Sequence, residues 1–520
     1  MINRNSLIAI LTTLLAAATP WAVEAQVSVS EDFTKATTNN VWYFFNGACL
    51  TASTASGVEP KLGTSGQLTG QIPGCTSIAG SYYNKSAGEV LTGGAKGTGN
   101  FPDPSGSGAL RFTNGYPYGY SENGGVIYSV PFNTGAGVAI TFKTVTYLGN
   151  SGGAGGDGAD GISFYLMDAS KLNTSTITGT SSGDGNGLGA WGGSLGYTCS
   201  NANSPYNGLI GGYLGLGVDE YGNFLNGSQW MPGYTGPNAA TGDNTQLGYG
   251  YKPNRIGLRG AGNIAWNWLN ANYPQFYPSG LSTSAQNAAV EATCAAGAVV
   301  NATSGNAVVT TASTTGTGTG PAYPLADYAP IPNAFIELGS GTQIANESAA
   351  TRGAATPISY QLKITQNGLL SLAYATCPPA GCGAYISVIN AQDITAANGP
   401  LPGNFLFGFA GSTGGSTNIH EILCFNADPD TTASSSAGAG EKQSAKLDTG
   451  VQAYFAYYNP QPGWTGRVTA NSLLFDTYGN ITLAATPNWD ASCYLSGGNC
   501  SSTGVTGCPV AASQTRASLA

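Results

Sequence analysis

Glycine constrains this chain more than any other residue type, because 78 of its 520 residues are glycine, about twice the share of an average protein. The glycines do not follow the every-third-residue repeat of collagen, so they serve turns and close backbone contacts. Disorder is disfavoured, since 41% of the residues are hydrophobic and 10% are aromatic, which supplies apolar surface for a core. The composition therefore predicts a folded protein built from strands and turns.

Charged residues are scarce, at 8% of the chain, and give a formal net charge of -9. This acidic balance disfavours nucleic acid and anionic membranes as partners. Neutral ligands or calcium suit such a surface better. A single histidine, His420, excludes sites that need two imidazoles, such as a zinc protease helix.

The first 25 residues have the features of a cleavable secretion signal, with Arg4, an apolar run and a small-residue site at Ala25. The apolar run is too short for a membrane span, and none is expected in the mature chain. Export makes the ten cysteines candidates for disulfides, although spacing alone does not settle their connectivity. The pairs that we consider are Cys377 with Cys382, Cys49 with Cys75, and Cys199 with Cys294.

Short runs of β-branched and aromatic residues recur between Gly, Ser, Thr and Asn, a pattern typical of an antiparallel all-β sandwich. Residues 285–296 instead favour a short helix. The expected strands are 41–45, 138–147, 161–167, 213–218, 360–364, 369–373, 405–410 and 420–425.

Composition divides the chain into regions. A sandwich over residues 26–428 is interrupted by predicted loop insertions at about 53–108 and 282–320, both of low complexity. A predicted linker at 429–450 leads to a small β segment at 451–496. The last residues, 497–520, form a tail that contains Cys500 and Cys508.

Four glycine-rich loops carry most of the chemically useful side chains. In chain order they are 158–161, 192–196, 216–223 and 411–415. Asp160, in the first loop, offers a carboxylate acceptor beside a flexible backbone, a combination suited to sugar hydroxyls. In the third loop Asp219, the Tyr221 carbonyl and Asn223 can converge on a hard cation, and Ca²⁺ prefers such oxygen ligands. A metal-free turn stabilised by Asp and Asn is the alternative.

Four aromatic residues lie near these loops. A sugar ring can stack on an aromatic face, whereas packing in the core or rim of the sandwich is the alternative for each residue. The residues are Trp191, Tyr197, Tyr221 and Trp230.

The order of the loops resembles that of the L-type, or legume-like, lectins over about residues 30–425. The resemblance implies an antiparallel β-sandwich of the concanavalin-like jelly-roll type that binds glycans with the help of Ca²⁺. The implied roles are sugar binding by Asp160, Gly192, Gly193, Asn223, Gly414 and Gly415, and calcium ligation by Asp219, Tyr221 and Asn223.

The chain departs from the family pattern at three positions. Gly217 and Arg255 stand where plant lectins use Glu and His for a transition metal, so that second metal site is expected to be absent. Ser228 stands in place of a second calcium-binding Asp. Asn226 and Asp243 are the substitutes that we consider.

A second segment, Asp476-Thr477-Tyr478-Gly479-Asn480, matches the metal loop of the family more literally than the segment at Asp219 does. It lies beyond the predicted linker, however, and outside the family order of loops. We therefore expect a β-turn there.

Two enzymatic alternatives are less well supported. Residues 192–196 formally fit G-x-S-x-G, but no helix follows Ser194 as a nucleophile elbow requires. We expect His420 to be a hydrogen-bonded strand residue. A sandwich-fold glycoside hydrolase needs two acids flanking one bond, and Glu220 should point to the sheet face opposite Asp219.

Residues 457–460, 464–466 and 488–491 resemble the segment before the propeller of secreted type IV pilus tip adhesins, with an unrelated small β module as the alternative. The whole sequence predicts a secreted, non-enzymatic, calcium-dependent carbohydrate-binding protein that acts as a surface or pilus-tip adhesin. Its expected partners are glycans and pilus or cell-surface components. A secreted glycoside hydrolase and a structural surface or pilus protein with vestigial sugar loops are the alternatives.

Overall fold

The structure, a computed structural model of the whole chain, describes residues 28–83, 88–150, 158–171, 187–225, 251–306, 325, 327–338 and 342–430, and the backbone of four later strands. Several predictions lie outside the described residues. These are the signal peptide, most of the linker and of the small β segment, the tail, Trp230, Asn226, Ser228, Asp243 and Asp476.

One of two large sheets contains nine strands. They are β1 Val29–Asp32, β3 Cys49–Leu50, β6 Leu110–Arg111, β9 Val138–Asn150, β14 Ala345–Asn346, β15 Ile358–Ile364, β16 Leu369–Thr376, β17 Ile386–Asp393 and β19 Thr417–Pro429. Their order is β17-β16-β15-β9-β19-β6-β3, with β1 on β19 and β14 on β9. Every pairing is antiparallel except that of β14 with β9.

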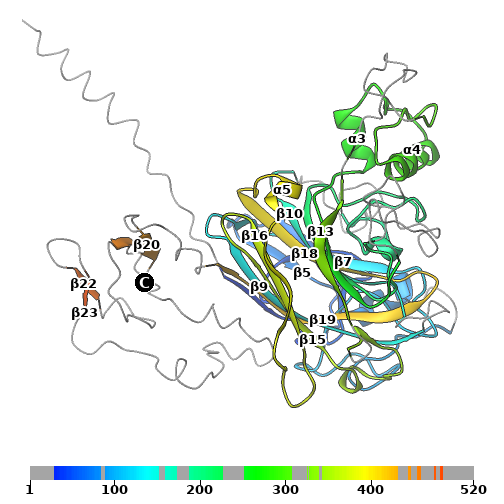
Figure 1. Cartoon of the computed structure of the whole chain (residues 1–520). Coiled ribbons are helices and arrows are strands. Elements are labelled where there is room, and N and C mark those ends of the chain that lie inside the picture. The colour runs from blue at the N-terminus through cyan, green and yellow to red at the C-terminus, as the bar shows by residue number, and fades with distance from the viewer. Residues whose placement is uncertain are drawn as a thin grey trace, which may run out of the picture.

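The second sheet contains eight strands and packs face to face with the first (Figure 1). They are β2 Trp42–Asn46, β7 Asn123–Tyr128, β8 Phe132–Asn133, β10 Gly161–Asp168, β11 Gly212–Asp219, β12 Arg255–Arg259, β13 Pro330–Glu337 and β18 Asn404–Ser412. Their order is β13-β12-β11-β10-β18-β7-β2, with β8 on β18. The predicted antiparallel β-sandwich is therefore confirmed, and each of the eight expected strands forms.

Shorter elements decorate the sandwich. The helices and helical turns are α2 Cys75–Ile78, η1 Ala79–Tyr83, η2 Gly192–Ser194, α3 Trp266–Asn272, α4 Thr283–Ala296, η4 Arg352–Ala354 and α5 Thr395–Asn398. The remaining strands pair as β4 Val58–Leu62 with β5 Leu68–Gln71, β20 Gln443–Lys446 with β21 Tyr454–Tyr457, and β22 Leu473–Phe475 with β23 Ile481–Leu483. None of the described helices is long and apolar enough to cross a membrane.

The predicted helix is confirmed as α4, which begins two residues earlier than expected. Ser282 caps it, because its hydroxyl oxygen accepts a hydrogen bond from the Ala285 N–H at 3.3 Å. Gly297 ends it in the left-handed conformation with φ +56°. With α3, this helix lies outside the two sheets (Figure 1).

Three disulfides join the cysteine pairs considered from the sequence. Cys49–Cys75 links β3 to α2, and Cys199–Cys294 links the loop after η2 to α4. Cys377–Cys382 closes the turn after β16. The first bond gives covalent support to residues 53–108, which also contain the β4–β5 hairpin.

Both faces of the eight-stranded sheet are buried, as the central strand β10 shows. Phe164 and Leu166 point into the core between the sheets, where Phe164 stacks on Phe142 with ring centroids 5.3 Å apart. Tyr165 and Met167 point the other way, into a second apolar cluster with residues of α3 and α4. Because both faces are covered, β10 is apolar from Phe164 to Met167 without polar alternation.

A buried ion cluster holds several loops to the nine-stranded sheet. Glu421 on β19 accepts hydrogen bonds from Arg111 Nε at 2.9 Å and Arg352 Nε at 2.6 Å. Asp103 also pairs with Arg352 at 3.0 Å. Burial by itself raises the pKa of Glu421, but the attraction of Arg352 and Arg111 outweighs it and lowers the pKa below its ordinary value.

Replacing Glu421 with Gln leaves two buried guanidinium groups without their shared carboxylate. We expect the free energy of unfolding to fall by about 3–5 kcal/mol. Lys35→Gln, which breaks an exposed pair with Asp32, is the control and should cost less than about 1 kcal/mol. Urea unfolding followed by tryptophan fluorescence measures both changes, and equal effects would contradict the assignment of Glu421 as a structural anchor.

Candidate functional site

Asp160 lies at the start of β10, where three strand ends meet. Its N–H donates to the Ser412 carbonyl at 2.8 Å, and its carbonyl accepts from Glu220 and Tyr221 at 3.0 and 3.2 Å. The peptide bond between Ala159 and Asp160 is cis. Asp160 is only 5% exposed, yet no described residue donates a hydrogen bond to its carboxylate. Since buried polar atoms are normally satisfied, this carboxylate is the exception that a ligand would explain.

The loop with Gly192 and Gly193 lies beside this carboxylate. Ser412 Oγ donates to the Gly192 carbonyl at 2.7 Å, which ties η2 to β18. A methyl group on Gly192 would lie 4.0 Å from Asp160 Oδ2. One on Gly193 would collide with the Asn223 Cβ, so only glycine permits this close approach.

The loop after β11 is shaped by Asp219. Its two carboxylate oxygens accept from the Gly222 N–H at 2.7 Å and the Phe224 N–H at 2.8 Å. This arrangement leaves Tyr221 and Asn223 partly exposed. No described residue donates to the Asn223 side chain or to the Tyr221 carbonyl. The loop therefore presents two unused oxygen acceptors next to Gly193.

The turn between β18 and β19 completes the site. A methyl group on Gly414 would lie 3.0 Å from Asp160 Oδ2, whereas one on Gly415 would meet nothing within 4 Å. The structure thus brings Asp160, Gly192, Gly414 and the pair formed by Gly193 and Asn223 to one end of the sandwich. Gly415 borders open space at the same turn.

Burial and mutual repulsion raise the pKa values of Asp160 and Asp219 at this corner. Burial raises the pKa of Asp219 to about 7, although the two loop amides and Arg255 lower it. Burial, and then repulsion from Asp219 and Glu220, raises the pKa of Asp160 well above its ordinary value. A cation or a hydrogen-bond donor at this corner would offset the cost of these charges.

Calcium fits this corner in its ligand chemistry. The Asp219 carboxylate, the Tyr221 carbonyl and the Asn223 amide oxygen are hard oxygen donors from one loop. Among the described residues no group of three His, Cys, Asp or Glu side chains could hold a metal. Arg255 pairs with Asp219 across the β11–β12 ladder and with Glu337 at 3.0 Å, so a guanidinium lies where the lectin pattern has its metal-binding His.

His420 is buried between the sheets and takes no part in a triad. Its ring nitrogens lie 2.8 Å from Thr113 Oγ1 and 2.9 Å from Glu220 Oε2. Ser194 instead donates to the Cys199 carbonyl at 3.1 Å. The expectation that His420 is a hydrogen-bonded strand residue is therefore confirmed, as is the orientation of Glu220 away from the Asp219 loop.

The aromatic residues near the loops have different environments. Tyr197 is fully buried and donates to the Gly260 carbonyl at 2.8 Å, so it belongs to the core. Trp191 and Tyr221 are partly exposed. Tyr221 meets Tyr251 edge to face with centroids 5.6 Å apart.

One polar residue that contacts the site, Asn203, has no signal in the sequence. A methyl group on Gly192 would collide with the side-chain nitrogen of Asn203. Asn203 lies in a stretch that has only turn-forming character in the sequence. No local pattern could place it here, because the Cys199–Cys294 disulfide and α4 determine where this stretch lies.

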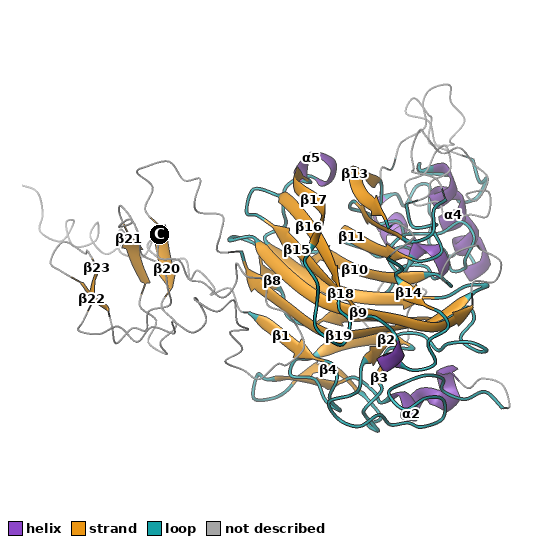
Figure 2. Cartoon of the chain, turned by 60° about the horizontal axis from the view of Figure 1, so that its bottom comes forward, coloured by secondary structure: helices purple, strands orange, loops and turns teal. Residues whose placement is uncertain are grey.

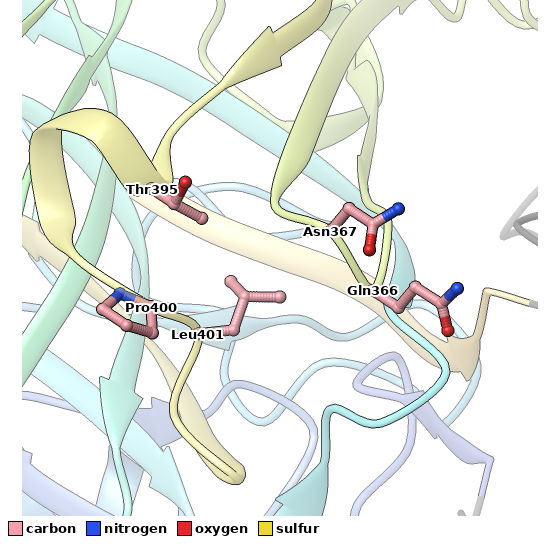
Figure 3. Close-up of a pocket in the computed structure, with 5 residues that line it drawn as sticks. All are labelled: Gln366, Asn367, Thr395, Pro400 and Leu401. Carbon is pink, nitrogen blue, oxygen red and sulfur yellow. The ribbon is translucent and has the colours of Figure 1, made fainter.

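A separate hollow of about 440 Å³ lies at the other end of the sandwich, near the beginning of β18. Figure 3 shows Gln366 and Asn367 of the β15–β16 turn across from Thr395 of α5, with Leu401 between them. Asp160 lies at the opposite end of β18, beside Ser412. The hollow therefore contributes nothing to the site around Asp160.

No protein-family model and no curated protein matches this chain in sequence. Among solved structures, basic winged bean lectin with the Tn antigen has a TM-score of 0.32 and 12% identity, covering 77% of this chain and 98% of that one. The Bauhinia forficata lectin in complex with GalNAc has a TM-score of 0.30 and 12% identity, covering 66% of this chain and 94% of that one. The VIP36 exoplasmic domain in its Ca²⁺/Man3GlcNAc-bound form has a TM-score of 0.28 and 11% identity, covering 62% and 81%. At these scores the assignment of the fold rests on the strand pairing described above.

Gly193→Ala tests the close approach of the two loops. The added methyl group would collide with the Asn223 Cβ, so we expect the free energy of unfolding to fall by about 1–3 kcal/mol. Gly415→Ala is the matched control, because its methyl group meets nothing within 4 Å, and a change within about 0.5 kcal/mol is expected. Urea unfolding measures both variants. An unchanged free energy of unfolding in Gly193→Ala would show that the loops are not in contact.

Proposed function

We propose that this protein binds carbohydrate at the end of the sandwich where four loops meet around Asp160. The observation that carries the proposal is the Asp160 carboxylate, which is buried and accepts no hydrogen bond from any described residue. A sugar hydroxyl would supply the missing donor. The Gly192 and Gly414 backbones approach closely enough to hold the same ring, and the Asn223 amide adds a further polar contact.

We propose that the protein binds the sugar without hydrolysing it. Hydrolysis of a glycosidic bond requires two carboxyl groups that flank it. Of the three acids near the site, Glu220 accepts hydrogen bonds from Asn418 and His420, and Asp219 accepts the two loop amides. Asp160 is the one acid of the three whose carboxylate accepts no hydrogen bond at all from a described residue.

Calcium is the proposed cofactor of this site. Asp219, the Tyr221 carbonyl and Asn223 would hold it. When bound, the cation would offset the buried negative charge and fix the loop that carries Asn223. This chain's own residues would then orient the Asn223 amide and the Asp160 carboxylate towards the sugar.

We further propose that the protein is exported and acts as an adhesin at the cell surface or on a pilus. The support is the predicted secretion signal over residues 1–25 and the resemblance of residues 457–460, 464–466 and 488–491 to pilus tip adhesins. Immunogold labelling of thin-sectioned cells tests the location. Label confined to the cell interior would exclude the adhesin role while leaving sugar binding open.

A glycan array probed with the purified protein tests the central proposal. Mannose, galactose and N-acetylgalactosamine, alone and within larger glycans, are suitable first probes. We expect binding in calcium and its loss in chelator. An array without bound glycans in calcium would overturn the proposal.

Asp160→Asn tests whether Asp160 contributes to sugar affinity without contributing to the stability of the fold. The amide keeps the shape of the side chain but removes a buried charge beside two other acids, so the free energy of unfolding should not fall. Sugar affinity should fall about 10- to 100-fold, because hydrogen bonds to a charged group are lost. Asp168→Asn, at the other end of β10, should leave affinity unchanged. Calorimetric titration with a sugar that the array identifies measures all three proteins.

Asp219→Asn and Asp476→Asn test which of two similar segments binds calcium. Asp219→Asn should weaken calcium binding at least about tenfold, since the loop loses its only carboxylate ligand. Asp476→Asn should leave calcium binding unchanged. Titration with calcium alone, without sugar, provides the measurement. The reverse result would move the metal to the later segment.

A further inference from the structure

A loop of residues 199–206 forms an additional wall of the candidate site. Asn203 Nδ2 donates to the Trp191 carbonyl at 3.0 Å, and a methyl group on Gly192 would collide with that nitrogen. The same methyl group would lie 4.0 Å from Asp160 Oδ2. The Asn203 amide and the Asp160 carboxylate therefore flank the same side of Gly192.

The loop is held by its own hydrogen bonds. Ser200 N–H donates to the Tyr206 carbonyl at 3.0 Å, and Ser200 Oγ accepts from the Asn203 N–H at 3.0 Å. The Trp191 indole donates to the Ser204 carbonyl at 3.2 Å. These bonds hold the loop backbone, and the bond from Asn203 Nδ2 to the Trp191 carbonyl orients the Asn203 side chain. Such order in the free protein lowers the entropy cost of binding a ligand.

Helix α4 supports the loop from outside the sandwich. Three residues on one face of this helix lie beside it, because positions three and four apart lie on the same side. Asn287 donates to Ser204 Oγ at 3.4 Å, and Cys294 forms the disulfide to Cys199. Burial, and then the nearby Glu291 carboxylate, raises the pKa of Tyr206. Figure 2 shows α4 at one side of the two sheets.

Two side-chain amide oxygens of the loop accept no hydrogen bond from the described residues. No described residue donates a hydrogen bond to Asn203 Oδ1, and the buried Asn201 Oδ1 likewise accepts none. Trp191, beside Asn203, keeps part of its indole exposed. Amide groups next to an exposed aromatic face are the combination that binds a sugar ring.

We propose that the loop of residues 199–206 is a second sugar subsite, with Asn203 as its main polar contact and Trp191 as its stacking surface. The subsite would take the neighbouring unit of a neutral oligosaccharide whose first unit Asp160 holds. It rests on the proposed function, because the second unit is positioned through the first. Asn203 is then a specificity-determining residue that favours oligosaccharides over monosaccharides.

The test compares the affinities for a monosaccharide and a longer sugar in the full-length wild-type protein and in Asn203→Ala. Mannose with mannobiose, and galactose with lactose, are the probes for calorimetric titration. We expect the ratio of disaccharide to monosaccharide affinity to fall about three- to tenfold in Asn203→Ala, the loss of one hydrogen bond. Asn367→Ala, an exposed asparagine at the opposite end of the sandwich, is the matched control and should leave the ratio unchanged.

A second variant keeps the test valid if Asn203→Ala disturbs the loop. Replacing Cys199 and Cys294 with Ala removes no proposed sugar contact but releases the loop from α4, so the ratio should fall here too. Thermal melting of each protein confirms that the sandwich is folded. An unchanged ratio in both variants, or an equal loss for both sugars, overturns the second subsite alone. A wild-type protein that binds none of the probes or array glycans overturns the proposed function and this inference with it.

Discussion

The register of β10 with its two neighbours is the constraint on which the rest of the site depends. Gly161 lies opposite Asp219 of β11 and opposite Ser412 of β18. That register places the residue before Gly161, Asp160, between the ends of both neighbouring strands, where its backbone bonds to each. A slip of one residue would exchange the two faces of β10, both of which are buried, so packing and site geometry are specified together.

Several of the scarce charged groups lie inside the protein. Glu421 is matched by two guanidinium groups, and Glu220 by an amide and an imidazole. Asp219 is matched by backbone amides and serves to shape its loop. Asp160 has the same burial but no donor. Three of these four carboxylates thus have protein donors, whereas Asp160 has none among the described residues, which is unusual for a buried polar group.

Local patterns predicted the long strands and the acidic loops well. The β10 and β18 runs are apolar because both of their faces are buried, and Asp160 and Asp219 stand beside the glycines that their loops require. Strands of two residues, such as β3 and β6, are too short to show any periodicity. The position of Asn203 could not be predicted either, since it follows from a helix about ninety residues later in the chain and not from its own neighbours.

The Cys199–Cys294 disulfide has a consequence for the order in which the protein is assembled. It joins residues 95 positions apart. Closing a loop of that length lowers the conformational entropy of the unfolded chain, which corresponds to about 4–5 kcal/mol of stabilisation. The loop at Asn203 therefore depends, for its covalent support, on a helix that comes much later in the chain. Strands β10 and β11 contain no cysteine, so an oxidising environment is needed for the support of this wall and not for the pairing of the strands beside it.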